Sequence, residues 1–319
     1  MGGKLELDAP VARYLPSWDN APSREITVRQ LLTHTGGFEQ GGTPQPLRTH
    51  ANLRAMVDGS GEQGPQHPPG EAYSYSDVDS YTLGALVAEI SGMPVELFIE
   101  ERIPDPLGLD DTHTRFAPHA TWADRMNPTY RREEGEWIKY WSPEQEQVAP
   151  FFRASGGLYS TTLDYARWLA VWTDGGRFAP RASDDGEGEV QLLSRATVEE
   201  ALSRHFGADY GYHWSIIMED PLVFGHGGSD GTHAMAIPSL DLMLLCFTQS
   251  RGTDIRQDWL VAALEATAPR LEIRFASLPD PRSPSALRPS ISIRPNGPAT
   301  WDATSRAPIP SSSAKPMAA

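Results

Sequence analysis

Nine residues, Pro69 to Asp77, run directly into the apolar-periodic stretch Val78 to Ile90 and constrain this chain more than any other feature. A Pro-Gly turn followed by the alternating Tyr73 and Tyr75 predicts a short extended segment, and Asp77 stands where a helix N-cap is expected. This order is expected to place Tyr75 at an exposed edge immediately before the helix. Taken singly, Tyr75 is most simply a packing aromatic and Asp77 only an N-cap, but further stretches of the chain change that balance.

The order of the remaining predicted elements indicates the fold class. Helices are expected where a capping residue or a proline precedes an apolar period, in the runs that follow Asp8, Thr27, Pro94, Thr161 and Ser194, and over Thr253 to Ala266. In the helix after Thr161, Leu163 and Leu169 are expected to face inward. Strands are expected at Asn127 to Arg132, Glu136 to Tyr140, Tyr210 to Met218, Leu222 to Gly225, Thr232 to Ile237 and Leu242 to Gln249, the last four as an antiparallel meander. Helices first and sheet afterwards predict an α+β fold.

Composition limits the classes of partner and cofactor. The formal charge of −15 over 319 residues disfavours nucleic acid and anionic membrane as partners. The apolar runs are too short for a transmembrane segment, and the single cysteine, Cys246, excludes an internal disulfide. The sequence offers no metal-binding or phosphate-binding motif, so we expect no metal and no cofactor. Oligomeric state and localisation stay open.

Three other stretches complete a recognisable set with the tyrosine segment. They are Ile26 to Phe38, Ala154 to Thr161, and Phe224 to Thr232, which reads Phe-Gly-His-Gly-Gly-Ser-Asp-Gly-Thr. In this order the chain, from about Gly3 to Ala266, closely resembles the serine beta-lactamase-like hydrolases: class C beta-lactamases, D-alanyl-D-alanine carboxypeptidases and family VIII esterases. The resemblance implies a beta-lactamase/transpeptidase-like fold and acyl-enzyme chemistry on a small-molecule ester, amide, lactam or short peptide. His34, inside the first stretch, is interpreted as a structural histidine.

The resemblance also implies the site residues. Tyr75 takes the position of the family's general acid/base, and His226 stands where a lysine is usual. Gly227, Gly228 and Ser229 form the oxyanion side, with the backbone N–H of Ser229 as one donor. Asp77 replaces the usual asparagine, and because a carboxylate accepts rather than donates to an amide, this exchange favours simple esters over lactams.

The nucleophile of the family is missing from this sequence. Its Ser-x-x-Lys motif should precede Gly3, so the N-terminal strands and the catalytic helix are expected to be cut off and the chain to be inactive as it stands. The spacing occurs once, at Ser312 to Lys315, in a tail without apolar periodicity, and we reject it as chance. Ser229 fits G-x-S-x-G, but that motif needs a helix after it and a strand is predicted instead. An incomplete hydrolase and a non-catalytic relative of the same fold both stay open.

Two domains are expected. Residues 1–276 form the hydrolase-like domain, and residues 277–319, with nine Pro and nine Ser, are predicted to be a disordered tail.

Overall fold

The computed structural model describes residues 5–39, 41, 50–115, 120–145, 147, 151–180 and 189–251, together with the backbone of 271–275 and 291–295. The chain divides into two units, Met1–Arg256 and Gln257–Ala319. In the second unit β10 (Leu271–Phe275) pairs antiparallel with β11 (Ile291–Pro295). Five residues of the predicted disordered tail therefore form a strand. The helix expected over Thr253 to Ala266 and the rest of the tail lie outside the described residues.

The first half of the larger unit is helical. Its helices are α1 (Val28–Leu32), α2 (Leu53–Gln63), α3 (Asp77–Ser91), α4 (Val95–Arg102) and α5 (Pro104–Leu107). Thr27 and Gln30 form the predicted capping box of α1, and Gly92 ends α3 in the left-handed conformation that glycine adopts without strain. Near Asp8 only the 3-10 turn Val11–Arg13 forms, because Pro10 supplies no side-chain cap. Among the described residues no single helix is long and apolar enough to span a membrane; α3 with α4 and α5 reaches that length only as a pair bent by 78°.

A compact aromatic and aliphatic core holds the helices together. Trp18, Met56, Tyr81 and Leu86 are fully buried in it. The Trp18 indole N–H donates to the Val57 carbonyl of α2 at 3.2 Å, so burial of the ring leaves no polar atom without a partner. Burying such side chains contributes roughly 1.5–3 kcal/mol each, which makes this core the main support of α2 and α3.

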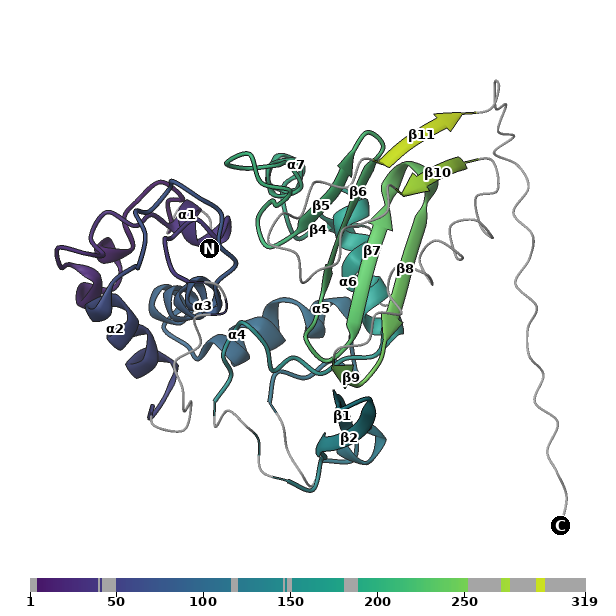
Figure 1. Cartoon of the computed structure of the whole chain (residues 1–319), viewed down its shortest axis with the longest axis horizontal. Helices are drawn as coiled ribbons and strands as arrows, with labels where there is room; N and C mark the ends of the chain where they lie inside the picture. The colour runs from purple at the N-terminus through teal and green to yellow at the C-terminus, as the bar shows by residue number, and fades with distance from the viewer. Residues whose placement is uncertain are drawn as a thin grey trace, which may run out of the picture. The chain divides into compact units, whose positions relative to one another are not determined.

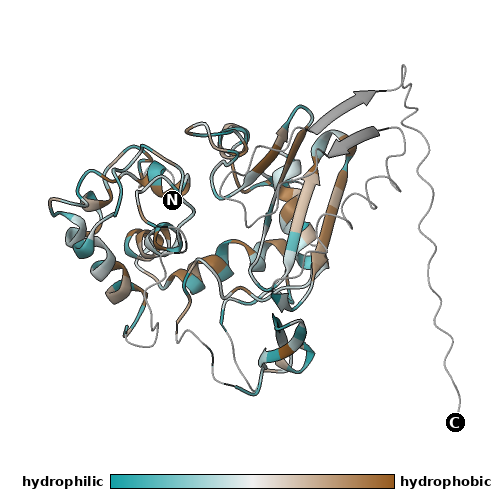
Figure 2. Cartoon of the chain, in the orientation of Figure 1, coloured by the Kyte–Doolittle hydropathy of each residue, from teal (hydrophilic) through white to brown (hydrophobic). Residues whose placement is uncertain are grey.

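The second half of the unit is built on a four-stranded antiparallel sheet in the order β5-β6-β7-β8, as predicted. Its strands are β5 (Ser215–Glu219), β6 (Leu222–Gly227), β7 (Thr232–Ile237) and β8 (Leu242–Phe247). Helix α6 (Thr162–Thr173), capped by Thr161, packs on β7 and β8 (Figure 1). Leu169 of α6 and Phe224 of β6 are fully buried in one apolar cluster between the helix and the sheet. Figure 2 shows β8 in the colour of apolar residues. Leu163 is 75% exposed, so the prediction that it faces inward was wrong.

Smaller strands and one further helix frame this sheet. The predicted hairpin forms as β1 (Thr129–Glu133) and β2 (Glu136–Trp141), and β9 (Ser250–Arg251) pairs parallel to β1. The hairpin turns at Glu134 and Gly135, both at positive φ. The remaining elements are β3 (Arg177–Phe178), β4 (Val190–Gln191) and α7 (Arg195–Ala201), which Ser194 caps as predicted.

Candidate active site

Tyr75 lies in the extended segment that enters α3. The N-cap of α3 is Ser76, whose hydroxyl accepts from the Val78 N–H at 3.1 Å; Asp77 is the first helical residue, so the N-cap interpretation of Asp77 was wrong by one position. The Asp77 carboxylate accepts a long hydrogen bond of 3.4 Å from the Tyr81 hydroxyl. A carboxylate at this place can accept but cannot donate.

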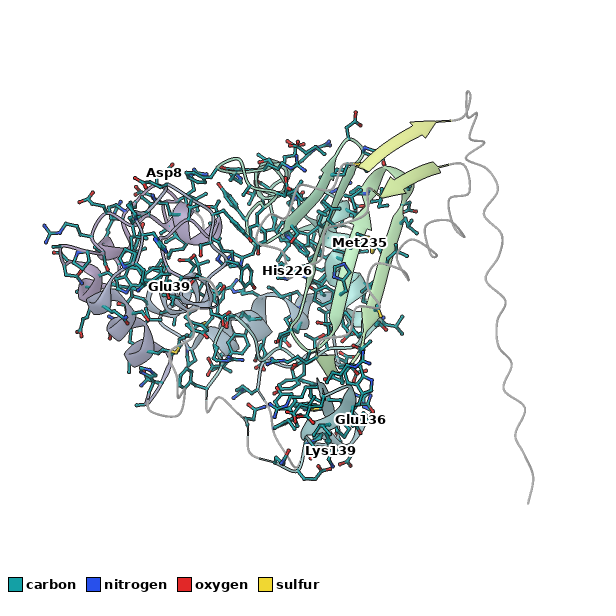
Figure 3. The ribbon with its side chains drawn as sticks, viewed as in Figure 1. Asp8, Glu39, Glu136, Lys139, His226 and Met235 are labelled. Carbon is teal, nitrogen blue, oxygen red and sulfur yellow. The ribbon has the colours of Figure 1, made fainter. Side chains whose placement is uncertain are left out.

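Aromatic rings and imidazoles surround Tyr75. Its ring centroid lies 4.4 Å from that of His34, 6.0 Å from that of His226 and 6.2 Å from that of Tyr210. His226 is on β6, on which Figure 3 labels it. The structure thus brings Tyr75 and His226 together, although 151 positions separate them in the sequence.

His226 is held as a neutral imidazole. Its Nδ1–H donates to the Gly227 carbonyl at 2.7 Å, and its Nε2 accepts from the Tyr210 hydroxyl at 3.0 Å. Burial lowers its pKa, and the hydrogen bond to Gly227 opposes that shift only in part. Both hydrogen bonds suit the uncharged ring, so His226 offers Tyr75 no positive charge.

The phenols of the site are held protonated. Burial raises the pKa of Tyr75, and the nearby Asp77 and Tyr81 raise it further. Burial, with a smaller contribution from Tyr75, raises the pKa of Tyr73 to about 12, and burial also raises the pKa of Tyr210 strongly. Among the described residues no cation lowers the pKa of Tyr75, so Tyr75 is an acid that keeps its proton rather than a ready base.

The turn between β6 and β7 forms the second side of the site. The Gly228 N–H donates to the Thr232 carbonyl at 2.8 Å, and the Gly231 N–H donates to the Gly228 carbonyl at 3.0 Å. Gly228 is required here, because a Cβ at this position would lie 2.3 Å from the Thr232 hydroxyl. In the described part of the chain, the backbone N–H of Ser229 donates to no other group, which leaves it open to a ligand.

The Ser229 side chain is engaged as an acceptor. Arg251 donates to Ser229 Oγ at 2.8 Å and pairs with Asp230 at 2.9 Å. A strand, β7, follows the turn, as predicted, and not the helix that a nucleophile elbow requires. In the described part of the chain, Ser229 Oγ therefore has a hydrogen-bond donor and no general base beside it, and its backbone setting is not that of a serine nucleophile.

Sequence reasoning missed several residues of this cluster. Tyr210 was assigned only to a predicted strand, and its neighbours, the half-buried His213 and the fully buried Asp79, had no role. His34 is fully buried, as expected of a structural histidine, but its Nε2 has no hydrogen-bond partner among the described residues. Only the closeness of these residues to the tyrosine segment in space identifies them, and no spacing in the sequence signals it. In the part of the chain that the structure describes, no cluster of His, Cys, Asp and Glu could hold a metal ion.

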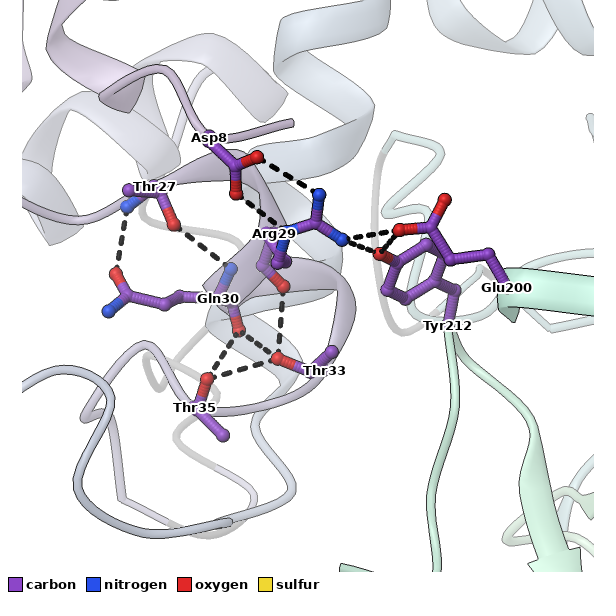
Figure 4. Close-up of polar contacts among 8 residues, drawn as sticks. All are labelled: Asp8, Thr27, Arg29, Gln30, Thr33, Thr35, Glu200 and Tyr212. Carbon is purple, nitrogen blue, oxygen red and sulfur yellow. Dashed lines mark hydrogen bonds and ion pairs between the residues drawn. The ribbon is translucent and has the colours of Figure 1, made fainter. Parts of the chain in front are cut away.

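A polar hub around Arg29 ties α1 to the sheet side of the unit. Its guanidinium donates to both oxygens of Asp8, at 2.6 and 3.0 Å, and to Glu200 at 2.7 Å, and it also contacts the Tyr212 hydroxyl (Figure 4). The hydrogen bond from Arg29 lowers the pKa of Asp8 and that of Glu200. Tyr212 lies one residue before His213 and two after Tyr210, so this hub fixes the segment that faces Tyr75.

Comparisons with known proteins agree with this architecture. The family model described as Beta-lactamase matches residues 2–268, well over half of the sequence. The chain belongs to the beta-lactamase family, whose members are serine hydrolases. It is 28% identical over 278 residues to an Escherichia coli (strain K12) protein named "Putative D-alanyl-D-alanine carboxypeptidase"; the match covers 74% of this chain and 61% of that protein, so this chain spans about three fifths of its relative.

Solved structures share the fold. A penicillin-binding protein homologue from Caulobacter crescentus superposes with a TM-score of 0.63 at 22% identity, over 83% of this chain and 77% of that one. EstCE1, described as a hydrolase with promiscuous acyltransferase activity, gives 0.62 at 18% identity, over 78% and 74%. At these identities the likeness establishes the fold, and the α+β, beta-lactamase/transpeptidase-like prediction is confirmed.

Proposed function

We propose that this chain carries the acid/base and oxyanion sides of an acyl-transferring serine hydrolase site. Tyr75 serves as the acid that protonates the leaving group, His226 orders the cluster as a neutral partner of Tyr210, and the Ser229 N–H donates to the developing oxyanion. Gly227 and Gly228 let the backbone approach the substrate. The observation that carries the proposal is the meeting of Tyr75 and His226, with ring centroids 6.0 Å apart, at the end of β6 that leads into the Ser229 turn.

Simple esters fit this site better than lactams or peptides. Asp77 can only accept hydrogen bonds, so it cannot hold a substrate carbonyl as an asparagine amide would. Alkoxide leaving groups also need less help from an acid than amines do, and Tyr75 holds its proton tightly. The substrate we propose is therefore a small acyl ester, with amides as the slower class.

None of the described residues of the site is suited to be the nucleophile. None of the 319 residues presents Ser-x-x-Lys in a helical pattern, and Ser229 is tied to Arg251. We expect the chain by itself not to form an acyl-enzyme. The alternative is a non-catalytic relative that binds acyl compounds with the same surface. It is favoured by the neutral state of His226 and because no cation in the described part of the chain lowers the pKa of Tyr75.

A covalent probe separates these possibilities. The 319-residue chain is treated with a fluorophosphonate and analysed by peptide mass spectrometry, beside a chain extended by the in-frame coding sequence upstream of Met1. We expect no label on the 319-residue chain and, if the upstream sequence encodes Ser-x-x-Lys, one label on that serine. Tyr75→Phe should then slow ester hydrolysis by on the order of 10²–10⁴-fold, because it removes a positioned proton donor.

Tyr130→Phe is the matched control, since Tyr130 is 37% exposed on β1 and has no part in the site. Stoichiometric labelling of Ser229 would overturn the proposed roles. An in-frame stop codon upstream, with tight binding of an uncleaved ester, would establish the non-catalytic alternative.

A further inference from the structure

The backbone N–H groups of the residues before and after Tyr75 both donate to one residue, His34. The Ser74 N–H donates to the His34 carbonyl at 2.8 Å, and the Ser76 N–H donates to His34 Nδ1 at 3.2 Å. The imidazole also packs against the Tyr75 ring, at 4.4 Å between centroids. His34 therefore contacts the tyrosine segment before, at and after Tyr75.

The backbone of His34 has an unfavourable conformation. Its φ of 53° lies in the left-handed region, which non-glycine residues adopt at a cost of order 1 kcal/mol or more. The side chain is fully buried, and its Nε2 has no partner among the described residues. A strained and incompletely satisfied residue persists only where the surroundings fix it, and here Asp79 does so from the first turn of α3.

The hydrogen bonds define the protonation of the His34 and Asp79 pair. Asp79 Oδ2 lies 3.2 Å from His34 Nδ1, and both side chains are fully buried. Because Nδ1 accepts the Ser76 N–H, it carries its single lone pair and no proton. The proton between the two side chains then belongs to Asp79 as a carboxylic acid, which shares that lone pair with the Ser76 N–H as a second donor. Burial acts in the same direction: it raises the pKa of Asp79, and, with the repulsion that protonated His213 and His226 would exert, it lowers the pKa of His34 to about 2. A neutral pair also avoids the desolvation of two buried charges.

We propose that His34 and Asp79 are positioning residues for Tyr75: a neutral imidazole and carboxylic acid pair, with the imidazole proton on Nε2, that fixes the orientation of the Tyr75 phenol. The inference rests on the proposed function, in which Tyr75 is the acid. It assigns no contact with substrate to either residue. Its consequence is that the orientation of Tyr75 depends on a donor at position 79 and not on a negative charge there.

The wild-type chain tests the tautomer directly. Histidine ring ¹⁵N shifts, with His34 identified by His34→Phe, should show Nε2 protonated and Nδ1 unprotonated at pH 7. An imidazolium, or a proton on Nδ1, would overturn the inference, because the Ser76 N–H would then have no acceptor on the ring.

Two substitutions of Asp79 test the positioning. Tyrosine ¹³Cζ signals are titrated in the full chain, and the Tyr75 signal is identified by its loss in Tyr75→Phe. Asp79→Asn keeps a donor to Nδ1 and should leave the Tyr75 shift and its titration unchanged. Asp79→Leu removes the donor and should move the Tyr75 titration toward the value of about 10 for an exposed phenol.

The outcomes separate the inference from the proposed function. If Asp79→Asn changes the Tyr75 signal as much as Asp79→Leu does, the pair is charged and the inference fails. Equally, a folded Asp79→Leu chain with an unchanged Tyr75 signal would show that the pair positions nothing. If Asp79→Leu does not fold, the tautomer and Asp79→Asn still decide. Absence of hydrolysis with all signals as expected counts against the proposed function alone.

Discussion

Protonation of His34 should make the protein markedly less stable in weak acid. Burial holds the pKa of His34 at about 2 in the folded chain, against 6.5 when it is free. Because the pKa of His34 is lower in the folded chain than in the unfolded chain, only the unfolded chain takes up a proton in weak acid. The stability of the folded chain is therefore full above pH 6.5 and is lost as the pH falls below that value. Each pH unit below 6.5 costs about 1.4 kcal/mol, which amounts to about 2.5 kcal/mol between pH 7 and pH 4.5.

This magnitude depends little on the folded pKa, provided that it lies well below 4.5. The groups that face His34 are Asp79, Tyr73, Tyr75, Tyr210 and His213. Burial chiefly, with the repulsion that a protonated His226 would exert, lowers the pKa of His213 to about 4, so this second imidazole adds to the loss in acid. The contribution of His34 must therefore be measured as a difference between two chains.

Urea unfolding at pH 7 and pH 4.5 gives that difference. His34→Gln should lose about 2.5 kcal/mol less than the wild type between the two pH values. Ile26→Val is the control: Ile26 is fully buried, and loss of a methylene should cost about 1 kcal/mol equally at both pH values. If wild type and His34→Gln lose the same stability, the folded chain accepts the proton on His34, and the neutral pair with Asp79 is refuted.

Three further outcomes are expected from urea unfolding. Asp79→Asn should gain stability relative to the wild type as pH rises above 3.8, since the raised pKa of Asp79 lets only the unfolded chain ionise there; a constant difference from pH 4 to 7 would contradict this. Gly61→Ala in α2 should destabilise the protein, because the new Cβ would lie 2.4 Å from the buried Trp18 ring. Gly59→Ala, in the same helix but beside open space, should stabilise the protein by about 0.5–1 kcal/mol. Equal effects of the two substitutions would refute the packing argument. Arg29→Ala should lower the free energy of unfolding by about 1–3 kcal/mol, because its charged hydrogen bonds are lost. Arg24→Ala, which removes one partner of an exposed ion pair, should change it hardly at all. Equal losses would show that the contacts of Arg29 do not hold α1 to the Tyr210 to His213 segment.

Local signals in the sequence predicted most of the elements that carry the site. The capping box at Thr27, the cap at Thr161 and the meander around Gly228 depend on residues close in the chain, and all formed as expected. Helix α2 was not predicted, because Gly59 and Gly61 lower its helix propensity, and contact with Trp18 compensates.

The parts of the site that escaped prediction depend on long-range contacts. His34 and Asp79 are 45 residues apart, and Tyr210, which precedes β5, hydrogen-bonds to His226 on β6. A histidine at positive φ gives no sign of itself in a sequence, because its cost is met by tertiary contacts. Likewise, Ser76 and Asp77 are both good caps, and only the backbone decides between them.

The hub at Arg29 has a consequence for how relatives are compared. Four acceptor oxygens, two from Asp8 and one each from Glu200 and Tyr212, surround one planar guanidinium, and a lysine ammonium cannot reproduce that fork of donors. An Arg-to-Lys exchange at this position, which sequence scoring treats as conservative, would therefore mark a relative in which α7 and the Tyr210 to His213 segment are anchored differently. If position 29 covaries with positions 8 and 200 among relatives, that covariation would record how the two halves of the site are joined.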